Sequence, residues 1–117
     1  MSTIERFERG PRHSRVVVHG GTAYFSGLTA TDATGSIEDQ TRQILEKADA
    51  LLATLGVDRS SLICANIWLR DIGDFGAMNR VWEGWIDPEH PPARATVESS
   101  LALPQLLIEI QFQAAVD

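Results

Sequence analysis

The most informative segment of this chain runs from Pro91 to Ile110 and reads PPARATVESSLALPQLLIEI. Apolar and polar residues alternate near both of its ends, and an alternation of period two is typical of β-strands. Between the two alternating runs, at about Ala102–Gln105, Pro104 favours a turn. We therefore expect the two runs to pair as a β-hairpin.

Two charged residues of this hairpin, Arg94 and Glu109, are candidates for a functional site. Paired strands must match apolar positions with apolar positions, because a slip of one residue turns every side chain to the other face. This rule predicts that Arg94 and Glu109 project from the same side of the sheet. Their distance depends on the register: about 7 Å if Thr96 faces Glu109, and about 13 Å if Glu98 does, at about 3.3 Å per residue.

The pair has a functional and a structural interpretation. Arginine stays protonated and offers a planar fork of donors, so Arg94 can bind a carboxylate at two points. Glu109 lies between Ile108 and Ile110, and a partly desolvated carboxylate is suited to handling a proton or a water. The alternative is a solvated sheet face on which the two residues form a weak surface ion pair.

Composition narrows the classes of protein to which the chain can belong. A length of 117 residues fits one domain, 1–117, with a single core. The net charge of −6 and the single lysine argue against a surface that binds nucleic acid. No apolar run approaches the roughly 18 residues of a membrane span, and residues 1–15 lack the apolar centre of a signal peptide. The single cysteine, Cys64, suits a reducing compartment, so we expect a cytoplasmic protein that does not bind a membrane.

The segments before this hairpin follow their own patterns. They are a hairpin over residues 16–26 with a Gly20-Gly21 turn, a helix from Ser36 to Gly56, a strand from Ser61 to Arg70, and a helix from about Asp74 to Ile86. Residues 4–15 are charged and are expected to form an edge segment or a loop. The order β-β-α-β-α-β-β predicts an α+β two-layer sandwich, in which a mixed β-sheet carries two helices on one face.

The other face of this sheet is neither dry nor fully solvated. In the strand 61–70, one face is apolar throughout: Ile63, Ala65, Ile67 and Leu69. The opposite face carries Cys64, Asn66 and Trp68, and the final hairpin adds Thr96 and Glu98 to it. A symmetric oligomer that pools these mixed faces resolves the mismatch, so we expect the chain to associate with copies of itself.

At these residues the sequence resembles a known family. The segment PARATVESS, the following LP and the IEI at 108–110 are similar to the C-terminal signature of the RidA family (also called YjgF), the enamine/imine deaminases, which are also described as endoribonuclease L-PSP. The resemblance extends to Ser26-Gly27, Asp74-Phe75, Met78-Asn79 and Trp82, and it covers essentially the whole chain. It implies the chorismate mutase-like fold of that family and a homotrimer with pockets between neighbouring subunits.

The resemblance also implies an activity and a role for five residues. The activity is the cofactor-independent hydrolysis of 2-imino or enamine acids, of the 2-iminobutanoate and 2-iminopropanoate type, to 2-oxo acids and ammonia. Arg94 would bind the substrate carboxylate, and Glu109 would hold the attacking water. Ser26, Asn79 and Thr96 would shape the pocket, with the Thr96 carbonyl accepting from the imine nitrogen although many relatives carry cysteine there. Asn79 has the alternative role of a structural hydrogen bond at a subunit interface, and Ser26 that of an ordinary strand end.

The chain departs from the family near its N-terminus. Many relatives carry a tyrosine after Gly-Pro, whereas Gly10-Pro11 is followed here by Arg12-His13, so the pocket for the substrate side chain does not transfer. The three histidines and Cys64 lack the spacing of a metal site, and we expect no metal and no cofactor. Two other functions are open: a non-catalytic trimer that binds small carboxylates or regulates, and a ribonuclease, which the acidic composition disfavours.

Overall fold

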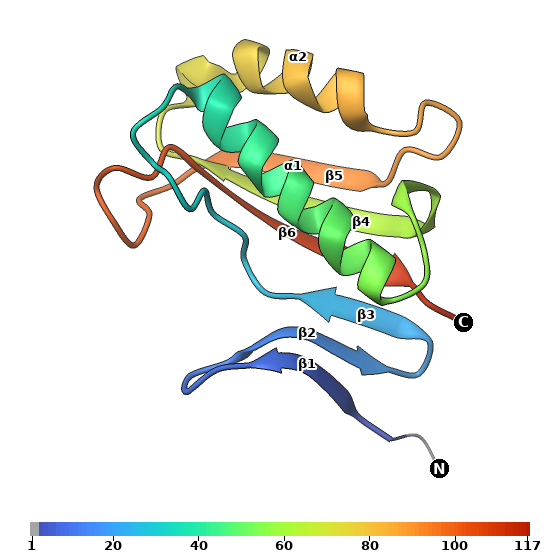
Figure 1. Cartoon of the computed structure of the whole chain (residues 1–117). Coiled ribbons are helices and arrows are strands. Elements are labelled where there is room, and N and C mark those ends of the chain that lie inside the picture. The colour runs from blue at the N-terminus through green and yellow to red at the C-terminus, as the bar shows by residue number, and fades with distance from the viewer. Residues whose placement is uncertain (1–2) are drawn as a thin grey trace.

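The computed structural model describes residues 3–117, so the first two residues of the predicted domain 1–117 lie outside the described part. Six strands form one mixed sheet, and two helices pack on one of its faces (Figure 1). The elements are β1 Glu5–Arg9, β2 Ser14–His19, β3 Thr22–Phe25, α1 Ile37–Thr54, β4 Leu62–Leu69, α2 Phe75–Trp85, β5 Ala93–Glu98 and β6 Ile108–Ala115. The predicted α+β sandwich, with both helices on one face, is confirmed.

The predicted edge segment contains an additional strand, β1. It pairs antiparallel with β2, and Phe7 lies opposite Val16. Its sequence, ERFER, has one apolar residue, Phe7, which packs against the core. The fold therefore has one strand more than the predicted order, because a charged edge strand shows almost no apolar period by which it can be recognised.

Helix α1 and the first tight turn are formed by the expected local signals. Ser36 is the N-cap of α1, and its hydroxyl accepts from the backbone N–H of Asp39 at 3.2 Å. Gly56, just beyond the C-cap, has φ +76°, a conformation that favours glycine. Gly20 and Gly21, with φ +60° and +80°, make the turn between β2 and β3.

The predicted pairing of the last two strands is wrong. The sheet order is β1-β2-β3-β6-β4-β5, so β4 lies between β5 and β6 (Figure 1). Strand β5 runs parallel to β4 after the α2 crossover, whereas β6 is antiparallel to both β3 and β4. Alternation in sequence shows which residues of one strand share a face, but it does not show which strand lies beside it. The loop 99–107 is long enough to reach across β4.

Strand β4 departs from the predicted alternation at its first residues. The register shifts between Leu62 and Cys64, so Ile63 is an extra residue in the ladder. As a result Leu62 is only 6% exposed, whereas Ile63, predicted on the apolar face, is 44% exposed. From Ala65 onward the prediction is confirmed, because Ala65, Ile67 and Leu69 are buried.

The core between the sheet and the helices fixes α2 in position. Trp82 of α2 stacks on Phe112 of β6, with ring centroids 6.2 Å apart and 4° between the ring planes. Phe25 of β3 meets Phe112 edge-on at 6.0 Å. The Trp82–Phe112 contact holds α2 over the sheet. Neither helix of residues 3–117 combines the length and apolarity needed to cross a membrane.

Candidate functional site

The structure separates Arg94 from Glu109, contrary to the prediction that both project from one side of the sheet. Arg94 of β5 lies opposite Ala65 of β4, which is buried beneath the helices. Glu109 of β6 lies opposite Trp68 of β4, and Trp68 lies opposite Val97, which is 50% exposed. Directly opposed residues share a face of a sheet. Arg94 therefore faces the helix layer, and Glu109 faces the open side.

This correction follows from the strand order. The prediction matched β5 to β6, but β5 pairs with β4, in a register that turns Arg94, Thr96 and Glu98 toward α2. Because β5 is an edge strand, Arg94 and Thr96 stay half-buried there, and Glu98 stays exposed. Thr96 and Glu98 thus do not belong to the mixed open face, whereas Asn66 and Trp68 lie there as predicted.

The guanidinium of Arg94 lies over two aromatic rings of α2. Its Cζ is 5.3 Å from the centroid of the Trp82 ring and 5.8 Å from that of Phe75. Within residues 3–117 it makes no ion pair and no hydrogen bond. Burial lowers the pKa of Arg94, an effect that nearby Glu83 opposes only in part, but arginine remains a cation at neutral pH. Its N–H donors are therefore available to an anion.

Asn79 and Thr96 lie on the same side as Arg94. Phe75, Asn79 and Trp82 occupy positions i, i+4 and i+7 of α2, so Asn79 shares the helix face of the two rings. Thr96 follows Arg94 by two positions in β5 and shares its face. We call Arg94, Asn79 and Thr96 the arginine group. It joins three of the five predicted site residues at the edge formed by α2 and β5.

The other two predicted residues, Glu109 and Ser26, form a second set, which we call the glutamate group. Gly27, directly after Ser26, lies against the Glu109 side chain: a Cβ on Gly27 would be 2.8 Å from Glu109 Cδ. Glycine is therefore needed for this close approach. A cavity of about 200 Å³ is lined by Glu109, Trp68 and residues 99–102 of the loop after β5.

Three buried side-chain oxygens have no hydrogen-bond partner within residues 3–117: Ser26 Oγ, Asn79 Oδ1 and Thr96 Oγ1. An unsatisfied buried polar group costs about 1–3 kcal/mol, and folded proteins contain few of them. All three belong to residues that the family resemblance assigned to the pocket. Burial and sequence thus lead independently to the same residues, whose polar atoms suit contact with a ligand or with a second protein chain.

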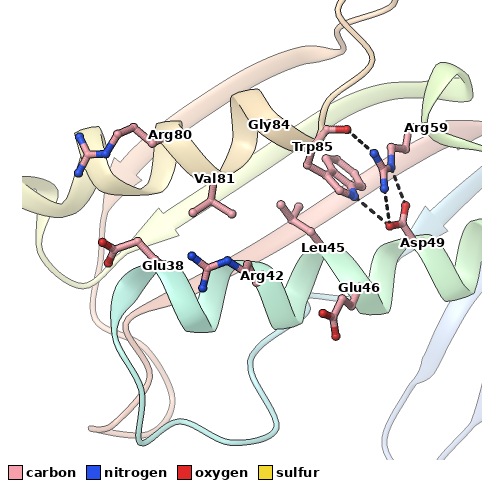
Figure 2. A pocket seen from close by; sticks show the side chains of 10 residues that line it. All are labelled: Glu38, Arg42, Leu45, Glu46, Asp49, Arg59, Arg80, Val81, Gly84 and Trp85. Atoms are coloured by element: carbon pink, nitrogen blue, oxygen red, sulfur yellow. Dashed lines mark hydrogen bonds and ion pairs between the residues drawn. The ribbon is translucent and has the colours of Figure 1, made fainter.

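A larger groove of about 620 Å³ lies between α1 and α2, and none of the five predicted residues lines it (Figure 2). Arg59 donates to both carboxylate oxygens of Asp49 at 2.9 Å and to the carbonyl of Trp85 at 2.6 Å. The indole N–H of Trp85 also donates to Asp49, at 3.0 Å. Burial acts to raise the pKa of Asp49, but the hydrogen bonds from Arg59 and Trp85 outweigh it and lower the pKa. Because these groups satisfy one another, the network connects α1, α2 and the turn before β4 structurally.

Two features of the site are not assigned from sequence. Phe75 is expected only as part of the Asp74-Phe75 motif, and its contact with Arg94 becomes evident only once β5 is known to run beneath α2. Trp68 is expected only as a residue of the mixed face, and it lies beside Glu109 on the open face. In the described part of the chain no three or more His, Cys, Asp or Glu residues converge as metal ligands, and Cys64 is a free thiol in β4.

The chain is similar to known proteins over nearly its whole length. The family model described as Endoribonuclease L-PSP matches residues 3–116. The RutC family protein YoaB of Escherichia coli is 39% identical over 114 residues, which cover 97% of this chain and 99% of YoaB. A YjgF family protein of Neisseria meningitidis has a TM-score of 0.95 at 36% identity, covering 98% of this chain and 96% of its own. An uncharacterized protein of Pseudomonas aeruginosa has the same TM-score at 38% identity, covering 98% and 100%.

Proposed function

Since the chain belongs to the RidA/YjgF family, we propose that it is a cofactor-independent hydrolase that converts reactive 2-imino or enamine acids into 2-oxo acids and ammonia. The observation that carries this proposal is the state of Arg94. Its guanidinium is half-buried and lies over the rings of Trp82 and Phe75, and it has no acidic partner within residues 3–117. A fixed cation with free donors is suited to a small carboxylate, and every substrate of this class carries a carboxylate beside the reacting carbon.

The proposed active site forms between copies of the chain. The arginine group and the glutamate group lie on opposite faces of one sheet, so a small anion does not touch both within one protomer. A neighbouring copy can bring its glutamate group against the arginine group of the first. A closed ring of three copies, as in the family, gives every copy the same contact. The unpartnered oxygens of Ser26, Asn79 and Thr96 support such an arrangement.

In this scheme water adds to the C=N carbon of the bound imino acid. Arg94 holds the carboxylate, and Glu109 orients the water, accepts one of its protons as the C–O bond forms, and passes this proton to the nitrogen. Glu109 then takes the remaining proton from the new hydroxyl and delivers it to the nitrogen, as the C=O bond forms and the C–N bond breaks. One imino acid and one water thus give one 2-oxo acid and one ammonia. Such imines hydrolyse without a catalyst, so an acceleration of about a thousandfold, roughly 4 kcal/mol, is useful. Positioning of the two reactants supplies this much.

The test generates imino acids in situ with an amino-acid oxidase and follows 2-oxo acid formation. The wild type is expected to accelerate the reaction, and Arg94→Ala to lose the acceleration. Arg80→Ala is the matched control, because Arg80 is an exposed arginine of α2 outside both groups. Equal rates for the wild type and Arg94→Ala would refute the proposal.

The second candidate is a non-catalytic trimer that binds small carboxylates or regulates. It is favoured by the fact that Arg94, Asn79 and Thr96 lie together within one protomer, so binding of a carboxylate there does not require Glu109. Calorimetry with a 2-oxo acid distinguishes the two: this candidate gives saturable binding, abolished by Arg94→Ala, without faster imine hydrolysis. A ribonuclease requires a basic surface for phosphates, which a net charge of −6 does not favour.

A further inference from the structure

A fully buried glutamine joins α1 to the loop before β6. Gln40 is 0% exposed, although it lies on a helix and is polar. Its Nε2 donates to the carbonyl of Gln105 at 3.2 Å and to that of Ala33 at 3.2 Å. Its Oε1 accepts from the backbone N–H of Leu107 at 3.0 Å. Both ends of one amide therefore bind the loop 99–107, on either side of Leu106.

An arginine holds the same loop from the end of β4. Arg70 Nε donates to the carbonyl of Leu106 at 2.7 Å, and its Nη2 donates to that of Leu103 at 2.7 Å. The backbone N–H of Arg70 donates to the carbonyl of Leu107 at 3.0 Å. These are charge-assisted bonds with two separate acceptors, which the planar guanidinium can reach together and a lysine cannot. We call Gln40 and Arg70 the loop clamp.

The clamped residues lie, in sequence, between two parts of the chain that line the Glu109 cavity. Residues 99–102 line that cavity. Glu109, the second residue of β6, lines it too. The clamp binds the backbone of residues 103–107, which connects them. Residues 103–107 belong to no strand, and their backbone has two backbone hydrogen bonds, from Arg70 N–H to the Leu107 carbonyl and from Leu106 N–H to the Leu103 carbonyl. The side chains of Gln40 and Arg70 satisfy further backbone groups of this segment.

We propose that Gln40 and Arg70 are positioning residues for Glu109: they fix the loop 99–107 so that its wall and the Glu109 carboxylate keep the geometry in which a water is held. This inference rests on the proposed function and extends it to two residues that touch neither substrate nor water. Within one protomer, Arg94 lies on the helix side of the sheet and the Glu109 cavity on the open side, and neither Gln40 nor Arg70 makes a hydrogen bond to the arginine group. Loss of the clamp therefore impairs the chemical step and leaves anion binding unchanged.

The main variants are Arg70→Ala and Arg70→Lys, with Arg42→Ala of α1 as the control. Arg70→Ala is expected to lower kcat for imine hydrolysis roughly 10- to 100-fold, since displacement of a catalytic group by about 1 Å can cost that much. The affinity for a 2-oxo acid, measured by calorimetry, is expected to stay within about twofold of the wild type. Arg70→Lys recovers part of kcat because one carbonyl regains its partner, and Arg42→Ala leaves both quantities unchanged.

Gln40→Glu provides an independent variant with nearly the same shape, because a carboxylate can accept from Leu107 but, when ionised, cannot donate to Gln105. If it does not fold, Arg70→Ala and Arg70→Lys carry the test alone. Faster amide hydrogen exchange at Leu106 and Leu107 is expected in the variants that fold. Unchanged kcat, or a parallel loss of 2-oxo acid binding, would overturn the inference. Should the wild type itself not hydrolyse imines, the proposed function fails; the clamp is then judged by amide exchange, and unchanged protection from Leu106 to Glu109 would overturn it.

Discussion

Arg94 and Arg59 both lie over tryptophan rings, yet among residues 3–117 only Arg59 has hydrogen-bond acceptors for its guanidinium. Arg59 Cζ is 4.9 Å from the Trp85 ring, and its fork is filled by Asp49 and a backbone carbonyl. Its hydrogen bond to Asp49 raises the pKa of Arg59. Arg94 is held by two rings, burial lowers its pKa, and it has no acid within residues 3–117. In both places the aromatic rings orient the guanidinium. Arg59 is already paired with a carboxylate, whereas Arg94 has donors available to bind a carboxylate from solution.

The sharpest test of this comparison is to truncate each arginine in turn. Arg94→Ala is expected to lower kcat/KM for imine hydrolysis by about 100-fold or more, roughly 3 kcal/mol, because a charge-assisted contact to the substrate carboxylate is lost. Arg59→Ala is expected to leave kcat/KM within about twofold. Steady-state kinetics on both purified variants gives the answer. A similar loss of kcat/KM in both variants would show that Arg59 is not merely structural and would contradict the comparison.

A second test gives Arg94 a carboxylate partner within the chain, as Arg59 already has in Asp49. Phe75→Glu introduces a carboxylate on the helix face beside Arg94, where the Phe75 ring is now 5.8 Å from its Cζ. This intramolecular acid is expected to compete with small anions and to weaken 2-oxo acid binding about tenfold or more. Phe75→Gln is the matched control, since it removes the ring without adding a charge. Calorimetry at low and high salt distinguishes the two variants, and equal affinities for both would contradict the expectation.

The same comparison shows how far the sequence could lead. Helices and most strands follow from local signals: Ser36 and Gly56 bound α1, and Gly20-Gly21 turns the first hairpin. The face of Arg94 could not be derived in this way, because it depends on β4 entering between β5 and β6, a contact between segments distant in sequence. The arginine itself was identifiable from its motif. Its aromatic support, and the Arg59–Asp49 pair ten residues apart in sequence, required the packing of α1 and α2.

Arg59, which is paired with Asp49, should contribute to stability and not to activity. Asp49→Asn removes the ion pair with Arg59 while keeping the size of the side chain. It is expected to lower the free energy of unfolding by about 1 kcal/mol, because both side chains are partly exposed and solvent screens the pair. Urea denaturation at neutral pH measures the change, and Arg80→Ala serves as the variant of an unpaired arginine. A loss as small as that of Arg80→Ala would mean that the Asp49 network does not hold the helices together.

The smallest expected effect is the pH dependence of that difference. The pKa of Asp49 is lower in the folded protein than its ordinary value, so its contribution is fully present above the unfolded pKa of about 3.9. It is lost as the pH falls through the lower folded pKa, because the protonated carboxyl no longer attracts Arg59. The stability gap between the wild type and Asp49→Asn should therefore be constant from pH 7 to about pH 5 and close by some tenths of a kcal/mol below about pH 4. Urea titrations across this range measure the gap. A gap that is unchanged at low pH would assign the effect of the substitution to packing and not to the charge that distinguishes Arg59 from Arg94.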